Sequence, residues 1–144
     1  MKIAKVFIAV FILSSLSHAN EDEQAGTKIG PDKGITEVSD SEGFKLSQEA
    51  LKNFDLKTLK LSSGPFWRIP ATAVLSSGEE TNLYRLRHGF YKRVDFSLLE
   101  CSGDFVKVQS KDLQKDDEVV IEGIGFLRIA ELAATGDASQ EHGH

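Results

Sequence analysis

Turn residues divide the chain between Phe66 and Gly123 into short apolar segments, one about every eight to ten residues. In residues 91–99 and 105–109 apolar and polar residues alternate, as they do in strands with one buried face. Strands are predicted over residues 66–75, 81–87, 91–99, 105–109 and 118–122, and a further one over residues 56–61. This spacing favours a mainly β fold, either a small β-barrel or a sandwich-like domain, with one or two short helices.

Two short helices are predicted at the ends of this β region. Ser47 is a typical N-cap residue, and it predicts a helix over residues 48–53. The second helix is predicted over residues 126–134, where apolar residues recur at helical spacing. Its apolar positions are Phe126, Ile129, Ala130 and Ala133. The first is expected to have two turns, and the second is expected to be short and amphipathic.

The N-terminus has the pattern of a secretory signal peptide. Two lysines precede the apolar run of residues 6–16, and small residues stand at Ser17 and Ala19 before the expected cleavage point. The apolar run is shorter than the roughly 20 residues that cross a bilayer. Cleavage of residues 1–19 is therefore predicted, with an uncleaved N-terminal anchor as the alternative. Either form places the rest of the protein outside the cytoplasm.

The charge balance narrows the class of partner. The chain has 17 basic and 22 acidic residues, a net charge of −5, and loss of the lysine-bearing signal makes the remainder more negative. Nucleic acid and an anionic lipid surface are therefore excluded as main partners.

Outside the β region the chain is polar. Residues 20–43 are rich in glycine and acidic residues, and they are predicted to form a flexible leader because they offer little apolar surface to bury. Residues 135–144 are predicted to form a mobile tail. One folded domain over residues 44–134 is expected between them.

Cys101 is the only cysteine, so no intrachain disulfide can form. We expect its thiol to be buried, because free cysteine is among the most buried residue types. Phe66 and Trp67 are assigned to the core rather than to an exposed aromatic anchor, since a small domain has few large apolar groups to bury. The same assignment is made for Phe44, Phe54, Phe90, Tyr91 and Phe105.

No arrangement of nucleophile, base and orienting group is visible, and a protein that is not an enzyme is expected. The C-terminal tail has the residues of a metal site. Glu141, His142 and His144 place two imidazoles beside a carboxylate, a set that suits Zn²⁺ or Cu²⁺. Two imidazoles on a flexible chain bind weakly, so the alternative is a polar terminus without metal. His88 and Cys101 could add ligands only if the fold brought them to the tail, and no cofactor is required.

Five segments in order resemble one known family. They are residues 68–75 (RIPATAVL), 83–89 (LYRLRHG), 92–94 (KRV), 103–108 (GDFVKV) and 119–123 (VVIEG). In this order they resemble the C-terminal part of the periplasmic adaptor subunits (membrane fusion proteins) of RND-type efflux pumps, above all the heavy-metal branch. Residues 44–58 resemble the segment that leads into the core domains of that family.

The chain departs from the family in one loop and in two missing domains. The loop before the last strand lacks the two glycines of the family, and no room exists between Leu61 and Phe66 for the lipoyl-like domain and the α-helical hairpin. The resemblance therefore implies a membrane-proximal domain, with pieces of the adjacent β-barrel, that cannot bridge two membranes by itself.

The resemblance implies a non-enzymatic periplasmic accessory protein, peripheral to the inner membrane, that docks on an RND efflux transporter or a full-length adaptor in heavy-metal efflux. It is compatible with a homo-oligomer. The alternative is a free-standing periplasmic protein that binds or senses metal.

Overall fold

The computed structural model describes residues 27–28 and 34–136. Strands and two α-helices follow one another along these ranges. Their order is β1 (Thr27–Lys28), β2 (Ile35–Ser39), β3 (Gly43–Leu46), α1 (Gln48–Phe54), β4 (Lys57–Lys60), β5 (Trp67–Pro70), the 3-10 helix η2 (Ala71–Ala73), β6 (Leu75–Ser77), β7 (Glu80–Arg87), β8 (Phe90–Asp95), β9 (Ser97–Ser102), β10 (Phe105–Gln109), β11 (Glu118–Glu122) and α2 (Ile124–Thr135).

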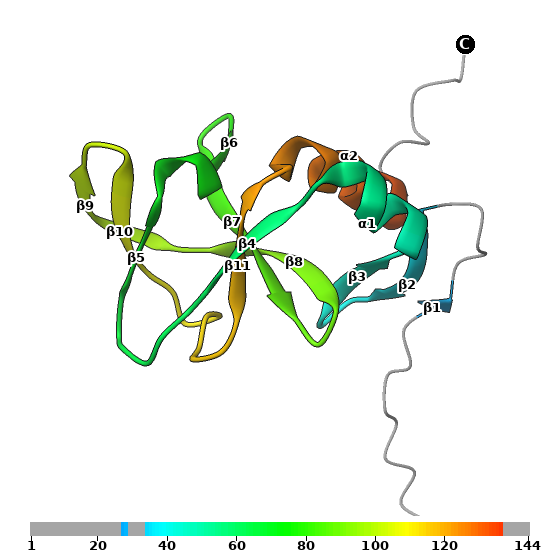
Figure 1. Ribbon diagram of the computed structural model, residues 1–144, viewed down its shortest axis with the longest axis horizontal. Helices are drawn as coiled ribbons and strands as arrows, with labels where there is room; N and C mark the ends of the chain where they lie inside the picture. Colours follow the sequence, from blue (N-terminus) through cyan, green and yellow to red (C-terminus); the bar gives the residue numbers. More distant parts are fainter. Residues whose placement is uncertain (1–26, 29–33, 137–144) are drawn as a thin grey trace, which may run out of the picture.

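In the described ranges the strands form two antiparallel sheets. The larger sheet has the order β1-β2-β3-β8-β7-β11-β4, with β6 paired to β7, and the smaller sheet has the order β5-β10-β9. The small sheet lies at one end of the molecule and the two helices lie at the other, with β7, β11 and β4 between them (Figure 1). The predicted mainly β fold with two helices is confirmed, and it is sandwich-like rather than a closed barrel.

Both faces of the large sheet are buried. Leu83 and Tyr84 are neighbours on β7 and point to opposite faces, yet both are 0% exposed. Leu83 belongs to a core shared with the small sheet, and Tyr84 belongs to a core shared with the helices. The first core includes Trp67, Ile69, Val94, Val106, Val108 and Val119, and the second includes Ile35, Phe44, Tyr91, Val120 and Leu127.

The leader predicted over residues 20–43 is partly wrong. Strand β2 (Ile35–Ser39) pairs with β3, and Ile35 is buried in the second core. Ile35 and Val38 have few apolar neighbours in sequence. The composition of the segment therefore predicts a flexible leader, although tertiary contacts stabilise a strand there. Thr27 and Lys28 extend the sheet as β1, and the other residues before Gly34 lie outside the described ranges.

The strand predicted over residues 91–99 is two strands. β8 ends at Asp95 and β9 begins at Ser97 in the other sheet, so Phe96 marks the crossing from one sheet to the next. All six residues of β9, an end strand of the small sheet, are exposed. The prediction that Cys101 is buried is therefore wrong.

The helix α1 begins where its N-cap predicts, since the Ser47 hydroxyl accepts a hydrogen bond of 3.1 Å from the Ala50 amide. The face predicted for α2 is wrong in part. Leu127 and Ala130 are buried, whereas Phe126 and Ile129 are 49% and 67% exposed. The helix is apolar on two sides, and only the side over the large sheet is covered. Among the described residues, no helix is both long and apolar enough to span a bilayer.

Gly43 is required where β3 meets β8. Its φ is +103°, and a Cβ there would lie 2.1 Å from the Tyr91 carbonyl oxygen. We predict that Gly43→Ala lowers the free energy of unfolding by more than about 2 kcal/mol, because backbone strain and overpacking add. Gly78→Ala is the control, since its φ is +63° but its Cβ would meet nothing within 4 Å. It should cost about 1 kcal/mol. Urea unfolding measures both, and equal losses would contradict this account.

An ion pair between β7 and the 110–117 loop predicts acid sensitivity. The Arg87 Nε and Nη2 atoms each lie 2.7 Å from an Asp117 oxygen. The backbone amide of Gln114 donates a 2.8 Å hydrogen bond to the same carboxylate. Burial raises the pKa of Asp117, but its hydrogen bonds with Arg87 and Gln114 lower the pKa further, and the net shift is downward. The carboxylate therefore stabilises the fold at neutral pH, and that contribution is lost as the pH falls through its folded-state pKa.

We predict that Asp117→Asn costs roughly 2–3 kcal/mol at pH 7, because it leaves Arg87 without its charged partner. The difference from the unchanged protein should narrow below about pH 4, where the unfolded carboxyl group begins to bind a proton. Asp116→Asn is the neighbouring control, since that side chain is 59% exposed and makes surface ion pairs only. A stability difference for Asp117→Asn that stays constant from pH 7 to pH 3 argues against this ion pair.

Candidate functional site: a cationic and aromatic groove

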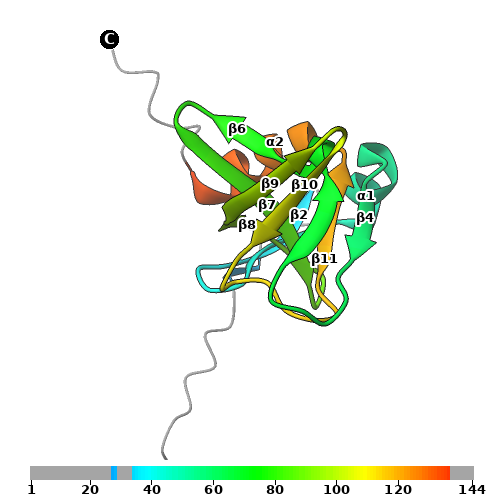
Figure 2. The same cartoon turned by 90° about the vertical axis from the view of Figure 1, so that its left-hand side faces the viewer.

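The small sheet turns one face inward and displays the other. On β5, Trp67 and Ile69 are buried while Arg68 is exposed, and on β10, Val106 and Val108 are buried while Phe105 is exposed. Figure 2 shows this end of the molecule, with β9, β10 and β5 toward the viewer. Because side chains alternate along a strand, the outward face carries polar and aromatic groups. They are Phe66, Arg68, Glu100, Ser102, Phe105 and Lys107.

Two cations on this face lie over two aromatic rings. The Lys107 ammonium is 3.9 Å from the centre of the Phe66 ring, and the Arg68 guanidinium is 4.3 Å from the centre of the Phe105 ring. Arg68 and Lys107 are also directly opposite each other in the β5–β10 register, so the two positive charges are neighbours. Phe66 and Phe105 remain 47% and 39% exposed. These contacts are surface cation–π pairs, each worth about 0.5–1 kcal/mol.

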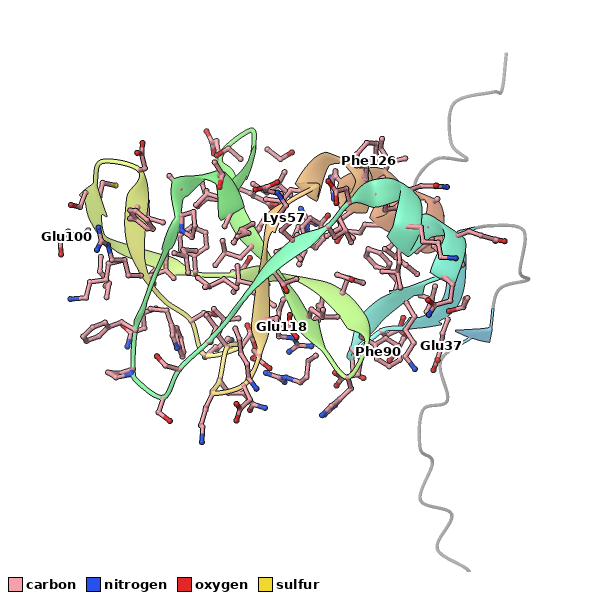
Figure 3. The ribbon with its side chains drawn as sticks, viewed as in Figure 1. Glu37, Lys57, Phe90, Glu100, Glu118 and Phe126 are labelled. Carbon is pink, nitrogen blue, oxygen red and sulfur yellow. The ribbon has the colours of Figure 1, made fainter. Side chains whose placement is uncertain are left out.

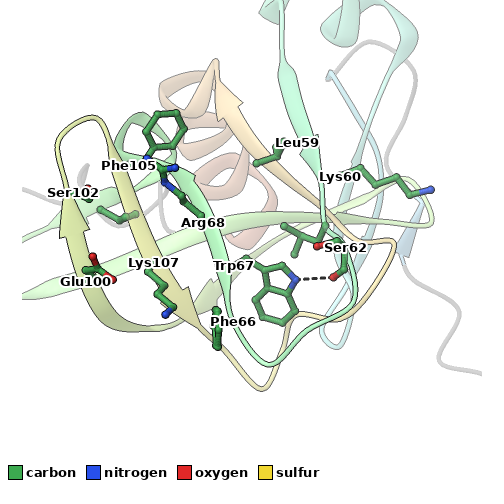
Figure 4. Close-up of a pocket in the computed structure, with 12 residues that line it drawn as sticks. Leu59, Lys60, Ser62, Phe66, Trp67, Arg68, Glu100, Ser102, Phe105 and Lys107 are labelled. Atoms are coloured by element: carbon green, nitrogen blue, oxygen red, sulfur yellow. Dashed lines mark hydrogen bonds between the residues drawn. The ribbon is translucent and has the colours of Figure 1, made fainter.

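A groove runs between this sheet and the end of β4. Its volume is about 710 Å³. Figure 4 shows Leu59, Lys60 and Ser62 on one side and the small sheet on the other. The indole of Trp67 lies between the two sides, and its Nε1 donates a 2.8 Å hydrogen bond to the Ser62 carbonyl oxygen. That bond joins the indole to the connection between β4 and β5.

Positive charge exceeds negative charge in the groove. Lys60, Arg68 and Lys107 line it with one acidic residue, Glu100. Lys60 pairs with Asp116 at 3.1 Å. Arg68 and Lys107 form no ion pair with any carboxylate in the described part of the chain. Lys107 is opposite Glu100 in register and nevertheless lies over Phe66. The groove therefore presents two cations whose ion-pairing capacity is unused.

The groove is suited to recognition by charge and aromatic contact, because two cations and two exposed rings lie side by side in its lining. The clearest shifts in pKa belong to structural contacts elsewhere. Burial, and then a hydrogen bond of 2.7 Å to Glu131, raise the pKa of Tyr84 at the interface of β7 and α2. Burial also raises the pKa of Tyr91 in the same core.

The structure leaves the predicted metal site untested. Glu141, His142 and His144 lie outside the described residues. His88 is exposed at the tip of the β7–β8 hairpin with a φ of +50°, and Cys101 lies on β9. Within the ranges that the structure describes, no group of three or more His, Cys, Asp or Glu residues could hold a metal ion.

Sequence reasoning missed the groove. Phe66 and Phe105 were expected in the core, and the structure places both on the outward face. Trp67 is buried as expected, at 7% exposure, and so are Phe44 and Tyr91. The signal was the alternation itself: if Val106 and Val108 face inward, then Phe105 and Lys107 must face outward.

The chain matches no protein-family model, and no curated protein and no solved structure shows significant similarity to it.

Proposed function

We propose that the protein is a non-enzymatic accessory protein of an RND-type heavy-metal efflux system. It docks on the efflux transporter or on a full-length periplasmic adaptor through the groove between β4 and the small sheet. One observation supports this choice of docking surface. On the outward face of the small sheet, exposed rings and two cations without carboxylate partners lie beside a groove.

The choice of partner class rests on the resemblance to efflux adaptors. The five segments of that resemblance fall, in order, on β5 with η2, β7 with its turn, β8, β10 and β11. β4 ends at Lys60 and β5 begins at Trp67, so the connection is too short for a lipoyl-like domain or an α-helical hairpin. A domain with this connection binds one component of an efflux assembly and does not bridge two membranes.

The location in this proposal is the periplasm, at the surface of the inner membrane. It rests on the signal-peptide pattern of residues 1–19, which lie outside the described residues. An exported domain with a net negative charge would meet its membrane through a protein partner rather than through anionic lipid.

Affinity capture from membranes tests the partner class. A tagged protein expressed with its own signal should recover an RND transporter or a full-length adaptor from detergent-solubilised membranes. Arg68→Glu/Lys107→Glu should reduce the recovery about tenfold or more, because it reverses both cations of the groove. The matched control is Lys52→Glu/Lys111→Glu, which changes net charge equally at exposed positions outside the groove. Recovery of neither transporter nor adaptor would overturn the proposal.

If Arg68 and Lys107 bind a partner, they should contribute little to the stability of the fold. We predict that Arg68→Ala/Lys107→Ala lowers the free energy of unfolding by no more than about 2 kcal/mol, because each surface cation–π contact is worth about 0.5–1 kcal/mol. Trp67→Ala, by comparison, should cost about 3–5 kcal/mol as a core truncation. Denaturant unfolding measures both. A loss in the double variant as large as that in Trp67→Ala would assign the cations a structural role instead.

A further inference from the structure

We propose that the groove binds an extended, carboxylate-rich peptide segment of the partner protein. This inference rests on the proposed function for the identity of the partner, but peptide binding itself is measured separately. It names the chemistry of the contact, which neither the fold nor the resemblance specifies.

Charge complementarity favours carboxylates. Arg68 and Lys107 are cross-strand neighbours, and neither has a carboxylate partner in the described ranges. Two adjacent like charges repel each other, and an anion placed between them relieves that repulsion. The guanidinium of Arg68 also offers parallel N–H donors that match the two oxygens of a carboxylate. Glu100 offsets part of this charge without pairing to Lys107.

Free strand edges favour an extended segment. β4 pairs with β11 and β5 pairs with β10, and each is the end strand of its sheet in the described part of the chain. Residues of both strands line the groove. An end strand presents unpaired backbone N–H and C=O groups, and an added peptide strand satisfies them.

The spacing of side chains favours an alternating sequence. Phe66 and Arg68 are two residues apart at β5, and Phe105 and Lys107 are two residues apart on β10. Ring and cation therefore alternate along both strands with the period of a β-strand. A peptide strand whose facing residues alternate between apolar and acidic would meet each ring with an apolar side chain and each cation with a carboxylate.

The groove is a poorer fit to an anionic membrane. Segments that bind anionic lipid bring about 4–8 basic residues together. This groove has three, one of which, Lys60, already pairs with Asp116, and Glu100 lies on the same face. A peptide with a few carboxylates needs only the two cations that are available.

Trp67 is the only tryptophan of the chain and lines the groove, so its fluorescence reports on binding there. The probe is an eight-residue capped peptide in which valine and glutamate alternate at every second position and threonine fills the others. We expect a saturable change in Trp67 emission, confirmed by calorimetry, with a dissociation constant of about 100 µM or less. The same peptide with glutamine in place of glutamate should bind at least about tenfold more weakly, because it lacks the charge.

The protein variants localise the binding. Arg68→Glu/Lys107→Glu should abolish it, whereas Lys52→Glu/Lys111→Glu should leave it unchanged, and circular dichroism confirms that both variants are folded. The inference is overturned by no saturable binding up to about 1 mM, by equal binding of the glutamine peptide, or by binding that survives the double reversal. Binding to phosphatidylserine vesicles in place of the peptide would also overturn it.

The two proposals fail separately. Peptide binding together with an affinity capture that recovers no efflux component would overturn the proposed partner class and leave the groove chemistry standing. Capture of a transporter that is unaffected by Arg68→Glu/Lys107→Glu would overturn the groove as the contact surface and leave the partner class standing.

Discussion

The fold depends on burial of both faces of the large sheet along β7 and β11. Leu83 and Tyr84 are adjacent and fully buried on opposite faces, and Val119 and Val120 repeat the arrangement on β11. A sheet buried on both sides needs a cover on each, and here the small sheet covers one face and the helices cover the other (Figure 1).

This arrangement explains why the outward face of the small sheet is available. Trp67, Ile69, Val106 and Val108 are held by the core, so their neighbours on β5 and β10 must face outward. Arg68, Phe105 and Lys107 occupy those positions on a rigid support. A preorganised surface loses little entropy when it binds a partner. At the other end of the molecule, the exposed ring of Phe126 stacks on the ring of Phe54, with 5.1 Å between the ring centres. Figure 3 shows Phe126 far from Glu100 on the small sheet.

Local sequence signals predicted most of the fold. The bounds of β10 follow from alternation, those of β11 follow from a short apolar run that ends at Gly123, and Ser47 marks the start of α1. Errors occurred where tertiary contacts decide the outcome. Strand β2 exists because Ile35 reaches a core built from distant segments, and the break between β8 and β9 reflects a change of sheet. Neither has a local signature.

The groove was not predicted, for a related reason. Its residues come from β4, β5, β9 and β10, and sequence alone does not reveal that the end of β4 lies beside the small sheet. Aromatic residues were assigned to the core by type, and Trp67 followed that rule whereas Phe66 and Phe105 did not. The metal ligands predicted at Glu141, His142 and His144 lie outside the described residues, so they stay a prediction.

Hydrogen–deuterium exchange on the complex with the captured transporter or adaptor shows whether the groove is the docking surface. If the groove is the docking surface, binding slows amide exchange within residues 57–70, which form β4, β5 and the connection between them, while exchange in α1 and α2 is unchanged. Protection confined to the helices, with exchange in residues 57–70 the same as in the free protein, would contradict this assignment of the docking surface.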